Sequence, residues 1–231
     1  TAATPFYFTC ILFLGIGILS MFVLHRDKAN SSIQKRSFWQ RINILKRLHS
    51  LFLNKRLQFL MIVSTCFTIA VDIFYEFGPV YLTIKWSLTP TRLIIYNAIL
   101  CVALAVGNGW LPAWIRAHVS NRTAIFTCTG GFAILLIGMV LTNSPYMMMT
   151  LFFLSGLAIG LAVTIITVKI SDTVPDQIQG EVMGVQVSLR VLGDALICLF
   201  GGFLLIFSSK FILLAAAGIS SFATAYYALK K

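Results

Sequence analysis

The stretch HRDKANSSIQKRSFWQRINILKRLHSLFLNKR, residues 25–56, is the most strongly basic part of the sequence. It contains nine of the 18 Lys and Arg residues of the chain, and it lies between one apolar run and a long series of further apolar runs. Lys and Arg beside hydrophobic spans stay on the cytoplasmic side of a membrane, because they translocate poorly. The stretch therefore predicts the direction in which every neighbouring helix runs.

The composition around this stretch is that of a membrane protein. The 231 residues are 58% hydrophobic and 11% charged, with a mean hydropathy of +0.90, whereas soluble domains are about 45–50% apolar and about 25% charged. The net charge of +11 lies in loops that flank apolar runs, so membrane topology and anionic lipid head groups explain it better than nucleic acid does. We expect an all-α, polytopic bundle in a lipid bilayer and no nucleic-acid partner.

Neither a cofactor nor a metal is expected. The five cysteines all fall inside apolar runs without paired spacing, which is typical of small core side chains rather than of disulfides or metal ligands. The three histidines show no HExxH motif, and the chain has no nucleophile elbow and no phosphate-binding loop. These observations argue against an enzyme.

Seven segments are long and apolar enough to span a bilayer, which takes about 20 residues. They divide the chain into residues 1–24, a basic central loop at 25–57, and a six-helix bundle at 58–231. The predicted spans are Thr4–Leu24, Gln58–Thr83, Arg92–Ala113, Thr123–Thr142, Tyr146–Val168, Met183–Phe207 and Lys210–Leu229.

The distribution of basic residues predicts the orientation. If the central loop is inside, then Trp114–Arg122, Lys169–Val182 and the C-terminus are inside too, and these regions hold 14 Lys and Arg against three outside. We expect a plasma (inner) membrane protein with its central loop and C-terminus in the cytoplasm.

The central loop itself has a helical pattern. Apolar residues recur every three or four positions between basic residues over Ile33–Leu57. The pattern indicates an amphipathic helix in the head-group layer, and a solvated linker is the alternative.

Four charged residues fall inside predicted spans, and intramembrane charge indicates a functional site. Asp72 and Glu76 share one face of their helix, as do Arg190 and Asp194 on theirs. Counted from the predicted cytoplasmic ends, Arg190 lies about 10 Å deep and Asp194 about 16 Å. The same count puts Asp72 at about 21 Å and Glu76 at about 27 Å.

Three acids and one base leave an unmatched carboxyl, which resists ionisation when it is buried. A carboxyl that alternates between protonated and paired forms can couple transport to protons. Asp72 is our candidate for this coupling or for contact with substrate, and a structural hydrogen bond between helices is the alternative. Glu76 fits a hydrated position near the outer end of the bundle. Arg190 and Asp194 are either transport residues or members of a mutual or interhelical ion pair.

Glycines indicate where helices pack closely, because small residues allow backbones to approach in a membrane. Gly156 and Gly160 form a GxxxG spacing, and Gly201-Gly202 follows in a later span. We expect the two helices after Ser155 to be tightly packed.

The stretch Ser171–Gly202, SDTVPDQIQGEVMGVQVSLRVLGDALICLFGG, resembles a cytoplasmic loop and the following helix in the C-terminal half of major facilitator superfamily transporters, closest to the drug:proton antiporters. The matching positions are Val174-Pro175, Gly180, Gly184, Ser188, Gly193 and Gly201-Gly202. Asp194 departs from the pattern, since the family more often has a small residue there or one that precedes proline.

Two further features resemble the same family. GNGWLPAWIRAHVSNR, residues 107–122, is similar to its basic inside-loop motif, although the Asp of that motif is missing. The order of one span, a long basic loop and six spans resembles helix six, the central loop and helices seven to twelve. The gating or loop residues that the resemblance implies are Gly107, Gly109, Arg116, Arg122, Pro175, Gly180 and Gly184.

The resemblance implies a secondary transporter that moves a small organic or amphiphilic solute, with protons, by alternating access. Its implied partners are the bilayer, the solute, protons and a first half of about five helices that is missing from this chain. The alternatives are an uptake carrier for a sugar, organic anion or peptide, and a non-transporting scaffold or decayed half-transporter.

Overall fold

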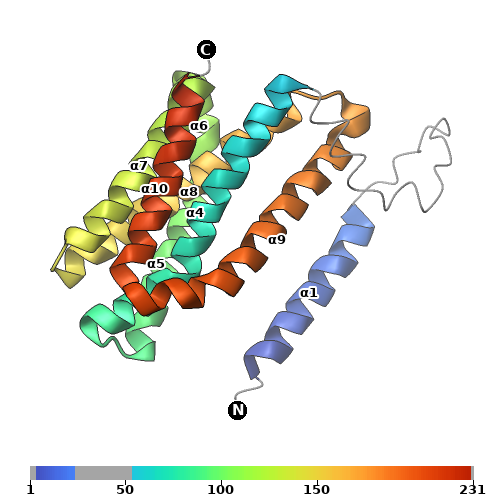
Figure 1. Cartoon of the computed structure of the whole chain (residues 1–231). Helices are drawn as coiled ribbons and strands as arrows, with labels where there is room; N and C mark the ends of the chain where they lie inside the picture. The colour runs from blue at the N-terminus through green and yellow to red at the C-terminus, as the bar shows by residue number, and fades with distance from the viewer. Residues whose placement is uncertain (1–3, 24–53, 230–231) are drawn as a thin grey trace. The chain divides into compact units, whose positions relative to one another are not determined.

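The computed structural model describes residues 4–23 and 54–229, which form α-helices and no strand (Figure 1). The chain divides into two compact units, residues 1–43 and 44–231. The first unit is described over α1, Thr4–Val23. Residues 33–53, most of the amphipathic segment predicted for the central loop, lie outside the described residues.

The second unit contains seven described helices, of which only α6 is short. Six of the seven predicted spans are confirmed as helices long and apolar enough to cross a membrane. The remaining one corresponds to α1, whose apolar stretch with described side chains, Thr9–Ser20, is shorter than a span. The helices are α4 (Lys55–Trp86), α5 (Pro90–Gly109), α6 (Leu111–His118), α7 (Asn121–Leu141), α8 (Pro145–Ser171), α9 (Asp176–Phe207) and α10 (Ser209–Leu229).

Local sequence explains where several helices begin and end. The Asn54 side chain accepts hydrogen bonds from the first amides of α4, and Ser120 does the same for α7. Pro90 and Pro145 occupy the first turns of α5 and α8, where an amide would lack a partner anyway. Ser87 ends α4 in the left-handed conformation with φ 49°.

Two predicted boundaries were wrong. The predicted loop Trp114–Arg122 contains most of α6, a short helix that lies within the basic motif of residues 107–122. The predicted span Met183–Phe207 begins seven residues earlier, at Asp176. The first two turns of α9 are polar, so a hydropathy criterion excluded them although they are helical.

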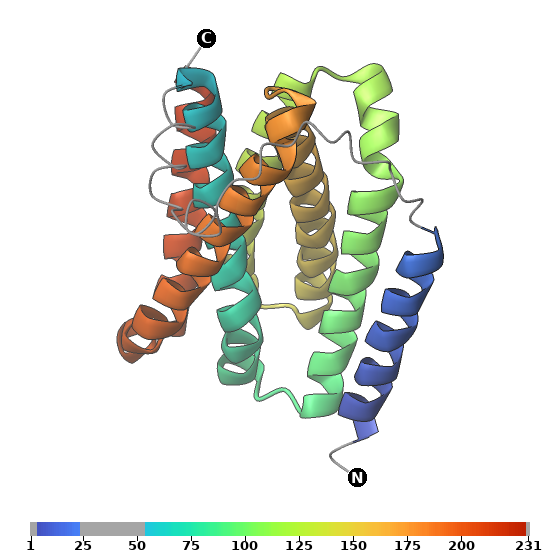
Figure 2. The same ribbon diagram turned by 90° about the vertical axis from the view of Figure 1, so that its right-hand side faces the viewer.

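Helix α4 forms the centre of the second unit. It packs against α8, α9 and α10, and the two views show α9 and α10 flanking it (Figures 1 and 2). Of its most apolar window 67% is buried, against 22% for α5 and for α9. These two helices therefore present apolar faces that the described helices do not cover.

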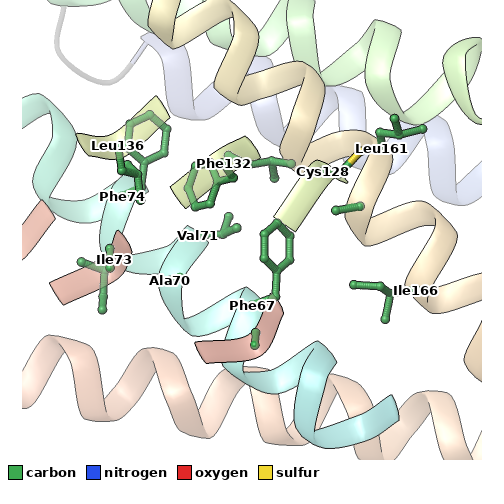
Figure 3. Packing of buried hydrophobic residues seen from close by; sticks show 14 of the residues in the cluster. Phe67, Ala70, Val71, Ile73, Phe74, Cys128, Phe132, Leu136, Leu161 and Ile166 are labelled. Atoms are coloured by element: carbon green, nitrogen blue, oxygen red, sulfur yellow. The ribbon is translucent and has the colours of Figure 1, made fainter. Parts of the chain in front are cut away.

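Aromatic side chains connect four helices through the core. Phe132 of α7 makes edge-on contacts with Phe67 and Phe74 of α4, with ring centroids 5.7 and 5.8 Å apart (Figure 3). Phe152 of α8 lies 5.1 Å from Phe74 and 5.5 Å from Tyr96 of α5. Such pairs add about 0.5–1.5 kcal/mol beyond burial, so this chain of rings holds α4, α5, α7 and α8 in register.

The end of α4 is tied to the end of α7 by polar contacts. The Tyr81 hydroxyl donates to the Met139 carbonyl at 3.3 Å, and the Lys85 ammonium donates to the carbonyls of Val140, at 3.3 Å, and Thr142. The last carbonyls of a helix have no partner within it. These contacts provide partners for the carbonyls of Met139, Val140 and Thr142.

Candidate functional site

An ion pair joins α4 to α9 inside the bundle. The Arg190 Nη2 atom donates to Asp72 Oδ1 at 3.1 Å. The Asp72 side chain is only 6% exposed, whereas that of Arg190 is 46% exposed. The second oxygen, Asp72 Oδ2, is buried and has no hydrogen-bond partner among the described residues. One carboxyl oxygen is therefore paired with a cation, and the other has no described partner that donates to it while Asp72 and Asp194 are both ionised.

Asp194 belongs to the same site. It lies one helical turn beyond Arg190 and interacts electrostatically with the Asp72 carboxyl. Tyr75, one turn along α4, also lies within the field of Asp72 and Arg190. Among the described residues, the Arg190 guanidinium pairs with Asp72, and the Asp194 carboxyl lies close enough to act on the Asp72 carboxyl.

A hydrogen-bonded pair continues the polar contact towards the start of the two helices. The Gln186 amide, one turn before Arg190, donates to the Ser64 hydroxyl at 2.8 Å and to Thr167 of α8 at 3.4 Å. Ser64 and Asp72 lie eight residues apart, which places them on one face of α4. Polar side chains therefore line the α4–α9 contact over more than one turn.

Counted from the predicted helix starts, Arg190 and Asp72 were expected about 11 Å apart in depth, and the observed helix starts reduce this difference. Arg190 lies 14 residues into α9 and Asp72 lies 17 residues into α4, which corresponds to about 21 Å and about 26 Å of helix. The change comes mainly from the earlier start of α9. The remaining difference is about 5 Å, and the long Arg190 side chain reaches Asp72 across it.

Glycine allows α9 to approach α4. A Cβ on Gly193 would lie 2.9 Å from Ile69 Cγ1, and one on Gly201 would lie 2.2 Å from Phe77 Cζ. Ser64 and Gln186 were not among the predicted site residues, whereas Gly193 was a position of the motif matched in Ser171–Gly202. The four-residue spacing of Gln186, Arg190 and Asp194 was the signal that could have identified Gln186.

Glu76 lies apart from this cluster. Its side chain is exposed one turn beyond Asp72. Within residues 54–229 no ion pair joins it to a cation.

The glycines of α8 lie against α5. A Cβ on Gly156 would lie 2.7 Å from Ala103 Cβ and 2.9 Å from the Leu100 carbonyl. Gly160 and Gly107 face each other, and a Cβ on Gly107 would lie 3.3 Å from Gly160 Cα. Gly107, which the resemblance assigned to the gating or loop motif, therefore contributes to a contact between α5 and α8.

The other predicted motif residues lie at the helix ends. Arg116 of α6 forms an exposed ion pair of 3.8 Å with Asp172, and Arg122 donates to the Ala228 carbonyl at 3.3 Å. Pro175 is the N-terminal flanking residue of α9. A Cβ would meet open space at Gly109, Gly180, Gly184 and Gly202.

Comparison with known protein families gives a match. The family model described as Major Facilitator Superfamily matches residues 2–197, which include α1, α4 to α8 and most of α9. No curated protein matches the chain significantly. The match covers more than half of the chain and includes both partners of the Asp72–Arg190 pair. The chain therefore belongs to the major facilitator superfamily, as an integral multi-pass membrane protein and a transporter rather than an enzyme.

Proposed function

We propose that this protein is a proton-coupled secondary transporter of the antiporter kind, in which Asp72 is the coupling carboxyl and Arg190 its partner. The observation that carries the proposal is the 3.1 Å ion pair across α4 and α9, with Asp72 buried and its second oxygen without a hydrogen bond among the described residues. An ionisable pair within a membrane span indicates a proton or substrate pathway by default.

Protonation of Asp72 changes the contact between two helices. The ionised carboxylate holds Arg190 on α4, whereas the neutral acid binds it far less strongly and frees the guanidinium for Asp194 or for the solute. A proton and a solute then compete for one arrangement of α4 and α9. Competition of this kind is what exchange of a proton for a solute requires.

The apolar faces of α5 and α9 support a small organic or amphiphilic solute. Both helices are largely uncovered, with Val102 of α5 and Leu199 of α9 59% and 71% exposed. In our proposal they form one wall of a cavity, and a further set of helices forms the opposite wall and alternates access by rocking. Efflux is the direction proposed, through a plasma membrane, with the central loop and the C-terminus in the cytoplasm.

The half-exposed Arg190 favours a second candidate. A guanidinium that is 46% exposed can bind the carboxylate of a solute directly. An uptake carrier for an organic anion would use the same ion pair, with the solute replacing Asp72.

Reconstitution of the full-length protein in liposomes tests the proposal. A pH gradient is imposed, and movement of the amphiphilic cation ethidium or of the organic anion benzoate is recorded together with internal pH. We expect ethidium to move against its gradient with wild-type protein. In Asp72→Asn we expect only downhill movement, because the asparagine cannot exchange a proton.

Glu76→Gln is the matched control, since it removes an exposed carboxyl one turn away on the same helix. It should retain gradient-driven movement. Undiminished proton-driven transport by Asp72→Asn would remove Asp72 from the mechanism. Proton-driven movement of benzoate alone would favour the anion carrier, and no movement of either probe would favour a non-transporting scaffold.

A further inference from the structure

Four cations surround one cavity at the end of the bundle where α4 begins. They are Lys55 and Arg56 of α4, Arg122 of α7 and Lys169 of α8. The cavity has a volume of about 470 Å³, within the usual range for ligand sites. Phe59 and Tyr227 contribute its aromatic wall. We call it the basic pocket.

Side-chain contacts position two of these cations. The Lys169 ammonium donates to the Tyr227 hydroxyl at 2.6 Å and lies 5.2 Å from the centre of that ring. The Phe59 ring stacks on Tyr227 with centroids 5.7 Å apart. Arg122 uses one nitrogen on the Ala228 carbonyl, which leaves further guanidinium donors for a ligand.

The positive charge of the basic pocket is uncompensated within the described part of the chain. No Asp or Glu lines the cavity, and none of its four cations forms an ion pair with a described acid. Lys55 and Arg122 also lie in the first turns of α4 and α7, where the helix dipole adds partial positive charge. Gathered cations repel one another, so an anion in the pocket would relieve a real cost.

The position of the pocket identifies the kind of anion. It lies at the ends of helices of 20 residues or more, which span the hydrocarbon core, and therefore at the depth of lipid head groups. A second cavity of about 280 Å³ shares Arg122 and Tyr227 with it and extends to Phe126. Phe126 is 46% exposed on α7, and it offers an apolar surface to an acyl chain below a bound phosphate.

We propose that the basic pocket binds the phosphate of an anionic membrane lipid, with the acyl chains along α7 beside Phe126. Pockets of Lys and Arg between membrane helices are suited to such head groups. The inference depends on the membrane location of the chain and not on proton coupling, since none of its residues belongs to the α4–α9 ion pair. Failure of one proposal leaves the other intact.

Thermal unfolding of the full-length protein in neutral detergent tests the site, with phosphatidylglycerol or phosphatidylcholine added at equal concentration. A ligand that binds the native state raises the unfolding midpoint. We expect a larger shift with phosphatidylglycerol. Arg122→Gln and Lys55→Gln should each weaken its binding about five-fold, and the double variant should lose most of the difference between the two lipids.

Lys210→Gln is the matched control, because it removes one exposed charge at the start of α10, far along the chain from the pocket-lining end of that helix. It should retain the full response to phosphatidylglycerol. Equal loss in this control would show general charge attraction and overturn the site. Inorganic phosphate in place of lipid should give no shift; if it shifts the midpoint as much as phosphatidylglycerol does, the pocket binds free anions and the lipid assignment is wrong.

A second measurement does not depend on how well the variants fold. Wild-type protein is cross-linked to a photoactivatable phosphatidylglycerol, and the modified peptides are identified by mass spectrometry. Cross-links concentrated on the peptides of Lys55–Leu60 and Arg122–Phe126 support the proposal. Cross-links spread evenly over both ends of the bundle overturn it.

Discussion

The contact of α5 with α8 and the contact of α4 with α9 differ in the residues that form them. In the first, Gly107, Gly156 and Gly160 bring two backbones together. In the second, Gly193 also permits close approach, but the Asp72–Arg190 pair crosses the contact. Both contacts thus bring two helices close together, and only the α4–α9 contact contains charged residues.

This difference indicates which of the two helix contacts can adopt a second arrangement. A contact of backbone on backbone has one good arrangement, because packed interiors transmit strain and do not deform continuously. An ion pair has two, since protonation or a competing charge removes its attraction. We therefore expect α5 and α8 to move as one body, and the α4–α9 contact to respond to protons and solute.

The largest effect is expected from Gly156→Leu. The new Cβ would lie 2.7 Å from Ala103 Cβ and 2.9 Å from the Leu100 carbonyl, and three further carbons follow it. Overpacking of this kind costs about 3 kcal/mol. The unfolding midpoint of the purified full-length protein should fall strongly, whereas Gly218→Leu, which meets open space on α10, should change it little. An equal midpoint in both variants would show that the α5–α8 contact is not rigid.

Arg190→Met should have the next largest effect. It leaves the buried Asp72 carboxyl without its cation, at a cost of about 2 kcal/mol, below the about 3–5 kcal/mol of fully buried pairs because Arg190 is half exposed. Adding Asp72→Asn removes the charge and should restore most of the unfolding midpoint.

The exposed Arg116–Asp172 pair provides the comparison for this variant. Arg116→Met should cost about 0–1 kcal/mol, because its acid, Asp172, is 62% exposed whereas Asp72 is only 6% exposed. If Arg190→Met and Arg116→Met lower the unfolding midpoint equally, the ion pair across α4 and α9 stabilises the protein no more than an exposed pair does.

The smallest effect concerns Ser64 and Gln186. A double-mutant cycle of Ser64→Ala and Gln186→Leu should give a coupling of about 0.6 kcal/mol, typical of hydrogen bonds between membrane helices. Thr129 bonds to Thr224 of α10 and not to α9. The stability losses of Gln186→Leu and Thr129→Val should therefore add when the two changes are combined. Coupling of the same size in both cycles would mean that the first reports general loosening of the bundle.

Apolar length alone was sufficient to predict most of the helices. Six predicted spans from Gln58–Thr83 to Lys210–Leu229 correspond to α4, α5, α7, α8, α9 and α10 within a few residues at most ends. The exception was the start of α9, because hydropathy measures contact with lipid and not helicity. Asp176–Val182 is helical but polar, and so Arg190 lies about two turns further from the start of its helix than the predicted span implied.

Residue chemistry selected the charged residues but not their partners. Asp72, Arg190 and Asp194 stood out because charge is costly in a membrane. Which of them pair could not be read from spacing, since Arg190 and Asp194 are neighbours on one helix and the observed partner, Asp72, lies 118 residues away in the chain. The basic pocket was equally hidden, because its four cations come from three helices.

The sequence by itself determined that this chain belongs in a bilayer, how many long helices it contains in its second unit, and which ionisable side chains those helices carry, because these properties follow from composition and from runs within single segments. The tertiary structure alone decided that Asp72 meets Arg190, that Gly107 meets Gly160, and that Arg122 and Lys169 share a cavity. These meetings depend on the depth and rotation of one helix against another, and both are properties of packing between segments that no single segment encodes.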